Sequence, residues 1–368
     1  MTKAIRHVLG ISGGKDSAAL AIYLKNKYPS LDIEYYTCDT GKELNETYEL
    51  VEKLESYLGK KITKLKAGEN SSKDPFDHFY NYYRGYLPSS NARWCTKTLK
   101  LDPFEDFVGT DPVISYVGIR GDEDREGYIS KKNNIQSIFP FRKNIWSEDV
   151  IAKVLKNDNI KSIEEIYSFS SKSANLDRII QIINQPINTR FTLQQKLNLL
   201  LDQDIKEFNR VVFEYLKITE YPLSRELNFP LIENDEILVR DDIFKILRES
   251  GVGVPAYYEP ITFEVDGKKG EYMRSRSGCY FCFFQQKIEW VWLLEQHPDL
   301  FEKAKYYENQ KDGFTWNPSE SLTELADPIR VENIKRDFLN RHKNKPKSSL
   351  LIDILDDSES EGCASCFI

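Results

Sequence analysis

A short glycine-containing loop near the N-terminus, set between a strand pattern and a helix pattern, constrains this chain most. Residues 5–11 are apolar and β-branched enough to predict a strand, and residues 16–27 predict the helix that follows. Between them runs Ser12-Gly13-Gly14-Lys15-Asp16-Ser17. Glycines let main-chain N–H groups approach an anion closely, and a helix N-terminus adds unsatisfied donors and a positive dipole end. The arrangement therefore predicts a loop that binds the phosphates of a nucleotide.

The side chains of this loop suit the same task. Ser12 and Ser17 can donate hydroxyl hydrogens to phosphate oxygens, Lys15 adds positive charge, and Asp16 is placed to help hold Mg²⁺. The loop is not a Walker A motif, because Asp16 follows Gly-Lys where that motif has Ser or Thr. A plain glycine turn capped by serine is the alternative interpretation.

Further strand and helix patterns follow and predict an α/β fold with a doubly wound, mostly parallel sheet. We expect strands over residues 33–38, 62–65 and 113–119, and a helix with apolar residues from Leu44 to Leu58 that ends at Gly59. Repeated β-α-β units imply a parallel sheet covered by helices on both faces. Ser12, Asp39 and Arg120 each come just after a predicted strand, so we expect them to converge on one crevice.

The rest of the chain divides by composition. We expect a nucleotide-binding α/β domain whose first part is 1–145, a helical insertion at 146–228, and a second α/β part at 229–310 that contains Cys279 and Cys282. A polar C-terminal extension follows at 311–368. Helices are predicted at 242–249 and 285–295 within the second α/β part.

Composition limits the class of protein. The chain has 368 residues, a net charge of −7 and 40% hydrophobic residues, typical of a globular protein and not of one coated in basic residues for non-specific nucleic-acid binding. No stretch approaches the roughly 20 apolar residues of a membrane span, and we expect a cytoplasmic protein with no membrane association. Its six cysteines are then expected as metal ligands, reactive thiols or core residues rather than disulfides.

Four of these cysteines form two Cys-x-x-Cys pairs, Cys279 with Cys282 and Cys363 with Cys366. A tight turn places both sulfurs of such a pair on the same side, which suits a metal ion or a cluster. A buried pair without metal is the alternative. Cys95 lies between Arg93 and Lys100, whose charges favour a thiolate, whereas Cys38 on a predicted strand is expected in the core.

Several blocks together resemble the PP-loop ATP pyrophosphatases, and within them the phosphoadenosine phosphosulfate (PAPS) reductase-like family. Ser-Gly-Gly-Lys-Asp-Ser looks like the PP-loop, and Asp39-Thr40-Gly41 is similar to the family's Asp-Thr-Gly strand end. Residues 93–100 resemble its Arg-x-Cys-Thr…Lys segment, and 118–125 resemble its Gly-x-Arg-x-x-Glu-Ser block, with Asp124 in place of Ser. The knuckle around Cys279 and Cys282 is similar to that of proteins related to DndC, which acts in DNA phosphorothioation.

The resemblance implies an adenine nucleotide alpha hydrolase-like fold, ATP and Mg²⁺ as ligands, and a [4Fe-4S] cluster or Zn²⁺ on cysteines. The implied catalytic residues are Lys15, Asp16, Cys95 and Arg120. The implied nucleotide-binding residues are Ser12, Gly13, Gly14, Lys15, Asp16, Ser17, Asp39, Thr40, Gly41, Arg93, Lys100, Gly118, Arg120 and Arg125. The implied metal ligands are Cys95, Cys279, Cys282, Cys363 and Cys366. For the arginines, ordinary ion pairing is the alternative, with Asp122, Glu123 and Asp124 close enough to supply it.

By this resemblance the chain is expected to split ATP into AMP and pyrophosphate and so adenylate a substrate in sulfur transfer to nucleic acid, as in DndC-like DNA modification or phage defence. Its expected partners are DNA or another nucleic acid, through partner proteins, and a cysteine desulfurase as sulfur donor. A PAPS or adenosine-phosphosulfate reductase is a second interpretation, and the small subunit of ATP sulfurylase is a variant of it. A nucleotide-sensing subunit without catalysis, in a defence complex, is a third.

Overall fold

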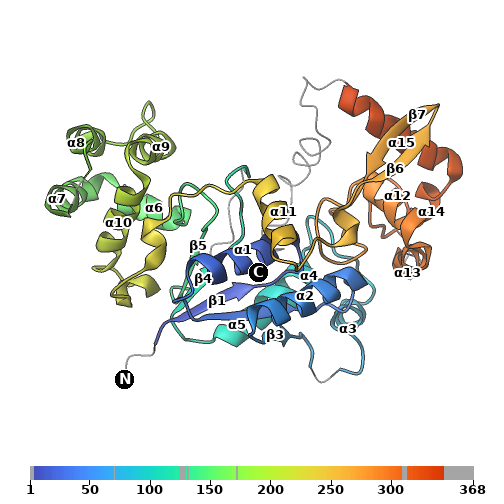
Figure 1. Cartoon of the computed structure of the whole chain (residues 1–368). Helices are drawn as coiled ribbons and strands as arrows, with labels where there is room; N and C mark the ends of the chain where they lie inside the picture. Colours follow the sequence, from blue (N-terminus) through green and yellow to red (C-terminus); the bar gives the residue numbers. More distant parts are fainter. Residues whose placement is uncertain are drawn as a thin grey trace. The chain divides into compact units, whose positions relative to one another are not determined.

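The computed structural model describes residues 4–69, 71–123, 130, 132–170, 173–308 and 313–343. Its centre is a five-stranded, all-parallel sheet with the strand order β3-β2-β1-β4-β5 and helices beside it (Figure 1). The strands are β1 (Arg6–Gly10), β2 (Ile33–Cys38), β3 (Ile62–Leu65), β4 (Val113–Tyr116) and β5 (Ile135–Ile138). The predicted α/β class with a parallel sheet is confirmed.

The central strands are buried as the fold requires. Val8 and Leu9 on β1 and Val113 and Ile114 on β4 have no exposed surface, because helices cover both faces of a parallel sheet. β1 pairs with β4 in the register that sets Arg6 opposite Val113 and Leu9 opposite Tyr116. The strand order changes direction at β1, the strand that the glycine loop follows, and in open α/β sheets ligands bind at such a point.

The described chain divides into two compact units. The first comprises residues up to Gly10, Ala19–Tyr35 and Val108–Ile246, and the second comprises Ile11–Ala18, Tyr36–Phe107 and the residues from Leu247 onward. The glycine loop therefore belongs to the second unit. Each unit is described separately below.

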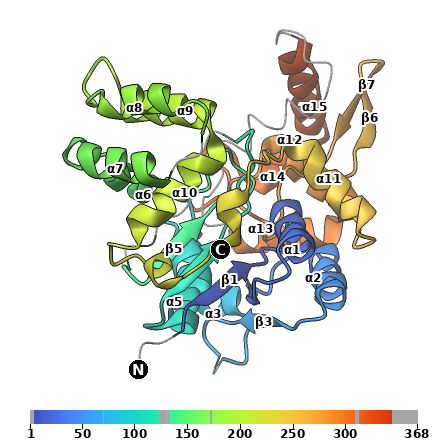
Figure 2. The same ribbon diagram turned by 60° about the vertical axis from the view of Figure 1, so that its left-hand side comes forward.

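The first unit contains the helical segment predicted at 146–228. Its helices are α6 (Glu148–Val154), α7 (Ile160–Ser170), α8 (Leu176–Asn184), α9 (Leu193–Gln203) and α10 (Ile205–Leu216), with short 3₁₀ turns at Asn157–Asn159, Pro222–Arg225 and Pro230–Glu233. Helix α8 packs against both α7 and α9 (Figure 2). The buried Trp146 donates its indole hydrogen to Asn209 Oδ1 at 2.9 Å. This hydrogen bond connects α10 to the segment just before α6. These residues form helices, and their assignment as an insertion between two parts of one α/β domain remains a prediction.

The second unit contains the remaining helices and an antiparallel hairpin. Its helices are α2 (Asn45–Leu58), α3 (Pro75–Tyr82), α4 (Trp94–Thr96), α5 (Asp102–Val108), α12 (Lys287–Gln296), α13 (Pro298–Glu308), α14 (Leu322–Leu325) and α15 (Pro328–Lys343), with a π-helical turn at Lys97–Leu101 and a 3₁₀ turn at Ala256–Tyr258. The hairpin pairs β6 (Ile261–Val265) with β7 (Lys268–Tyr272). Helices α1 (Lys15–Lys27) and α11 (Arg240–Glu249) have residues in both units, as does α5, whose last residue Val108 belongs to the first unit.

An aromatic cluster forms the core of the C-terminal part of this unit. The Phe281 ring stacks on Trp316 with centroids 4.7 Å apart and contacts Phe76 at 4.5 Å. Tyr307 meets both Phe76 and Phe281 edge-on, at 5.4 and 5.2 Å. Because Phe281 lies between Cys279 and Cys282, this cluster fixes the cysteine knuckle to the core.

Several predicted boundaries need correction. The strand expected at 113–119 ends at Tyr116, just before Gly118, whose missing side chain gives a strand nothing to pack. β5 and the β6–β7 hairpin were not predicted. β5 has only four residues, and its buried Gln136 and Ser137 hide any apolar pattern. Among the described helices, none is both long and apolar enough to cross a lipid bilayer.

Gly59 ends α2 as predicted, and its conformation gives a clean test. Its φ is 65°, in the left-handed region, and a Cβ added there would meet no atom within 4 Å. Gly59→Ala should therefore lower the free energy of unfolding by about 1 kcal/mol through backbone strain alone. Gly59→Asn should cost less, since Asn tolerates this conformation. Urea unfolding of both variants checks this, and equal stability of wild type and Gly59→Ala would contradict it.

Candidate active site

The glycine loop is held closed by its own serines. Ser12 donates its main-chain hydrogen to Ser17 Oγ at 3.2 Å, and Ser17 donates its hydroxyl to the Gly14 carbonyl at 3.3 Å. Gly13 has a φ of 72°, which side chains rarely adopt, so glycine is required at this position. The turn delivers the chain into α1, whose N-terminus supplies the dipole end that favours an anion.

Two opposite charges are buried at the start of α1. Lys15 and Asp16 are only 2% and 5% exposed, and Lys15 Nζ lies 3.3 Å from Asp16 Oδ2. Lys15 Nζ also donates to the Ser275 carbonyl at 3.4 Å and lies 5.0 Å from the centre of the Tyr258 ring. The pair therefore offers a cation and a carboxylate next to the main chain of the glycine loop, where both act in a low-dielectric setting.

Residues far along the chain pack over the loop within the same unit. Tyr257 donates its hydroxyl to the Gly13 carbonyl at 3.0 Å, and Tyr258 accepts from the Lys15 main chain at 3.4 Å. A Cβ on Gly14 would lie 2.6 Å from Ser277 Oγ, and one on Gly13 would lie 2.2 Å from Thr47 Cγ2. A side chain at either position would therefore have to displace a side-chain atom of Ser277 or Thr47. No local pattern in the sequence marks Tyr257, Tyr258 or Ser277 for this role.

The segment after β2 lies beside the loop and completes a pocket. Ser12 and Asp39 line the same pocket, as expected from their places after β1 and β2. Asp39 Oδ1 accepts from the Gly41 main chain at 2.9 Å and from the Tyr48 hydroxyl at 3.2 Å. The lining residues are Ser12, Thr37, Cys38, Asp39, Glu43, Thr47, Tyr48, Val51 and Lys64.

Glu43 is a pocket residue that the sequence did not single out. Its carboxylate accepts from the Thr40 hydroxyl at 2.6 Å and from the Tyr48 hydroxyl at 3.0 Å. Burial raises the pKa of Glu43 above its ordinary value, against the lowering effect of these hydrogen bonds. The sequence carried no signal for it, because one Glu among the charged residues of a loop looks like a solvated side chain.

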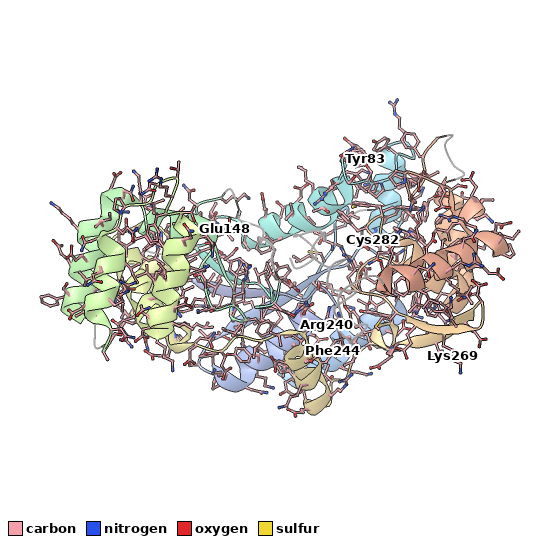
Figure 3. The ribbon with its side chains drawn as sticks, turned by 90° about the horizontal axis from the view of Figure 1, so that it is seen from above. Tyr83, Glu148, Arg240, Phe244, Lys269 and Cys282 are labelled. Atoms are coloured by element: carbon pink, nitrogen blue, oxygen red, sulfur yellow. The ribbon has the colours of Figure 1, made fainter. Side chains whose placement is uncertain are left out.

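The Cys279–Cys282 pair lies in the tight turn that its spacing predicted. The Cys282 main-chain hydrogen bonds to the Cys279 carbonyl at 3.1 Å, and Cys282 is labelled in Figure 3 on the segment before α12. Cys279 Sγ lies 3.2 Å from Thr40 Oγ1, so the knuckle contacts the Asp39-Thr40-Gly41 segment. Burial, followed by the nearby Glu43 carboxylate, raises the pKa of Cys279 above its ordinary value.

The other cysteines occupy different settings. Cys38 donates its thiol to the Lys100 carbonyl at 3.6 Å, and burial raises its pKa to about 12. Cys95 is half-buried on α4. Among the described residues, no three His, Cys, Asp or Glu side chains form a group that could hold a metal ion. Cys363 and Cys366, the other predicted ligands, lie outside those residues.

The predicted cluster or zinc site therefore remains a prediction, and we derive no reaction step through it. Iron, zinc and sulfide analysis of anaerobically purified protein tests it. Metal lost in Cys279→Ser and kept in Cys38→Ser would support the ligand assignment, and metal-free wild-type protein would contradict it.

The predicted arginines are found in both units. In the first, Arg120 is 1% exposed and forms ion pairs with Asp122 at 2.9 Å and Glu123 at 2.7 Å, the local pairing named above as the alternative. Gly118 is buried between β4 and Arg120, and Arg125 falls outside the described residues. In the second unit, Arg93 is exposed and stacks over the Phe284 ring at 4.8 Å. The convergence of Arg120 with Ser12 and Asp39 remains a prediction.

The contact between Gly14 and Ser277 predicts a compensating pair of substitutions. Gly14→Ala should lower the free energy of unfolding by about 1–3 kcal/mol, because the new Cβ meets Ser277 Oγ. Adding Ser277→Ala removes that oxygen and should recover at least half of the loss, while Ser277→Ala alone changes little. Denaturant unfolding of the three variants measures this, and a double variant no more stable than Gly14→Ala would disprove the packing.

Comparison with known proteins gives a partial match. Residues 6–167 match the phosphoadenosine phosphosulfate reductase domain, which is under half of the 368-residue chain. An uncharacterized protein of Methanocaldococcus jannaschii is 36% identical over 146 residues, covering 36% of this chain and 28% of the relative. A second uncharacterized protein of that organism is 28% identical over 160 residues, covering 40% of this chain and 36% of the relative.

The chain thus spans about a third of the length of these curated relatives. No solved structure matches it significantly. Residues 6–167 are thus similar to the PAPS reductase domain.

Proposed function

We propose that this chain binds ATP at the Ser12–Ser17 loop and cleaves it to AMP and pyrophosphate, adenylating a substrate in sulfur transfer to nucleic acid. The observation that best supports this proposal is the structure of the loop. Gly13 is in the left-handed conformation and Gly14 is close-packed before α1, and Lys15 and Asp16 are buried beside them. Fixed main-chain donors and a buried lysine stabilise the charge that develops on a leaving pyrophosphate.

In this reaction an acceptor oxygen attacks the α-phosphorus of ATP. The bond between the α-phosphorus and its bridging oxygen breaks, and pyrophosphate leaves with that electron pair, while the acceptor's proton passes to water. The outer sulfur of a donor persulfide then attacks the acceptor atom that bears the AMP oxygen, and AMP leaves with that oxygen and its electron pair. A thiol reductant finally cleaves the S–S bond by forming a disulfide with the donor. The loop N–H groups and Lys15 hold the leaving oxygens. A Mg²⁺ ion fits this donor set, because one carboxylate plus substrate phosphates is its usual ligation, and Asp16 is the carboxylate at the loop. When bound, it would neutralise phosphate charge.

The sulfur part of the proposal rests on the cysteine knuckle. Cys279 contacts Thr40, the residue after Asp39, so a thiol lies beside the segment that follows β2. The match of residues 6–167 to a PAPS reductase domain also supports sulfur chemistry. We propose a cysteine desulfurase as the source of the sulfur, and DndC-like DNA modification or phage defence as the setting.

An exposed aromatic and basic surface after α3 supports a nucleic-acid acceptor. Tyr82 is 71% exposed and Tyr86 is 37% exposed, and the Tyr82 and Tyr83 rings lie 5.2 Å apart. Arg84 and Arg93 are exposed nearby in the sequence, and neither forms an ion pair among the described residues. Exposed rings on which bases stack, together with guanidinium groups for the backbone, suit single-stranded nucleic acid. Tyr83 is labelled in Figure 3.

A PAPS reductase is the second candidate, favoured by the name of the matching domain. Such an enzyme would release sulfite from PAPS through a nucleophilic cysteine. Sulfite release without AMP formation from ATP would replace the first proposal with this one. Binding of ATP with no turnover would instead favour a nucleotide-sensing subunit.

Asp16 gives the direct test of the reaction. Asp16→Ala should lower the rate of AMP and pyrophosphate release from ATP by about 100-fold or more, because the loop loses its magnesium carboxylate. ATP labelled at the α or the γ phosphate distinguishes AMP and pyrophosphate from ADP and phosphate. Asp158→Ala, at an exposed ion pair with Lys156 in the first unit, is the control and should keep full activity. ADP as the product would refute the proposal.

The aromatic surface predicts binding of single strands. Tyr82→Ala should weaken binding of a single-stranded oligonucleotide roughly 5- to 100-fold, the range expected for loss of one stacked base. Fluorescence anisotropy at fixed salt measures this. Phe169, which is 98% exposed in the first unit, supplies the control substitution Phe169→Ala. Equal losses in both variants, or none in Tyr82→Ala, would rule out this surface.

A further inference from the structure

Arg274 is a buried cation with no counter-charge among the described residues. Its side chain has no exposed surface, and its Nε and Nη1 atoms are buried without a hydrogen-bond partner. Nη2 donates to the Cys279 carbonyl at 3.2 Å, and the guanidinium lies 5.8 Å from the centre of the Tyr257 ring. In the part of the chain that the structure describes, no carboxylate comes within ion-pair distance of Arg274. An isolated buried charge is costly, so this arrangement implies a missing anionic partner.

Two other buried cations of the chain show the contrast. Arg120 pairs with Asp122 and Glu123, and Lys42 pairs with Asp74 at 2.8 Å and Asp77 at 2.9 Å. A cation–π contact with Tyr257 offsets only part of the cost, about 0.5–2 kcal/mol. Arg274 thus differs from these two in having two donors to spare.

The surroundings of Arg274 place those donors next to the phosphate loop. Tyr257, over whose ring the guanidinium lies, is the residue whose hydroxyl bonds to the Gly13 carbonyl. The neighbouring Ser275 accepts from Lys15 Nζ at 3.4 Å. On the same knuckle, Gln285 is 5% exposed and has both side-chain polar atoms buried without a partner. All these contacts are within the second unit.

We propose that Arg274 binds a tetrahedral oxyanion of the nucleotide, a phosphate or a sulfo group, alongside the Ser12–Ser17 loop. Nε and Nη1 each carry N–H donors without a partner, and such charge-assisted donors bind phosphate and sulfo oxygens. The two atoms lie on different edges of the guanidinium, so each would donate to a separate oxygen. The proposal deepens the proposed function and rests on it for the nucleotide, which the loop holds. Arg274 is then a binding residue for the oxyanion that the loop itself does not hold.

The test compares Arg274→Met with the wild-type full chain and with Arg178→Met, an exposed arginine of the first unit. Three ligands are used without magnesium: ATP, PAPS, and adenosine 3′,5′-bisphosphate, which lacks the sulfo group. Calorimetry gives each affinity, and thermal unfolding gives the Tm with and without ligand. Arg274→Met should keep or raise the Tm of the ligand-free protein, because an unpaired buried charge is removed.

The same variant should lose about 10- to 100-fold in affinity for its ligand, the range for charge-assisted hydrogen bonds. A loss for ATP assigns a phosphate to Arg274. A loss for PAPS that spares the bisphosphate assigns the sulfo group. Unchanged affinity for all three ligands overturns the proposal, as does a markedly lower Tm of the ligand-free variant, which would show a structural role.

The proposed pyrophosphatase reaction and the proposed Arg274 site can be disproved independently of each other. Wild-type protein that produces ADP would refute the pyrophosphatase reaction but leave oxyanion binding by Arg274 measurable. Normal AMP production with an unchanged KM for ATP in Arg274→Met, together with unchanged affinities, would refute the Arg274 site and leave the reaction standing.

Discussion

Close packing of the Gly13-Gly14 backbone against Thr47 and Ser277 is the constraint on which the rest of the candidate site depends. A Cβ at either position would have to displace a Thr47 or Ser277 side-chain atom, and without one the loop presents its main-chain atoms. The Tyr257 hydroxyl then fixes the Gly13 carbonyl on one side of the turn. The main-chain donors at the start of α1 are what such a turn offers to an anion.

The same packing also buries the charged side chains of the candidate site. The same enclosure that immobilises the loop buries Lys15, Asp16 and Arg274, so each interacts strongly with whatever enters. Burial also raises the pKa of the Glu43 carboxyl and the Cys279 thiol, which share the hydroxyl of Thr40. The glycine loop, the Glu43 carboxyl and the Cys279 thiol are therefore parts of one continuous set of contacts in the second unit.

Much of the sheet was predictable from sequence because its signals are local. β2 and β3 have the predicted bounds, and Gly59 ends α2 in the left-handed conformation that glycine favours. β5 was missed, since four residues that include Gln136 and Ser137 carry no apolar pattern. The β6–β7 hairpin was also missed, although β6 alternates Ile261, Phe263 and Val265 with polar residues and an Asp-Gly turn follows it. Only β7, Lys-Lys-Gly-Glu-Tyr, lacks a strand pattern.

In the candidate site, too, some residues could be predicted from the sequence and others could not. The loop residues and Asp39 were predictable because each follows a strand directly. Tyr258 and Arg274 were not, since their roles depend on contacts between distant segments: Tyr258 and Lys15 are 243 residues apart in the sequence. No periodicity or spacing encodes such a contact. The unpaired guanidinium of Arg274 becomes visible only when every neighbour in the fold has been placed.

One measurement tests the central claim most directly: a crystal structure of the chain with Mg²⁺ and an ATP analogue whose α–β bridge is a methylene group. The account predicts that the β and γ phosphates lie on the N–H groups of residues 13–17, with Asp16 on the metal side and Lys15 at the phosphate oxygens. Phosphates bound elsewhere, with the Ser12–Ser17 loop empty, would contradict it.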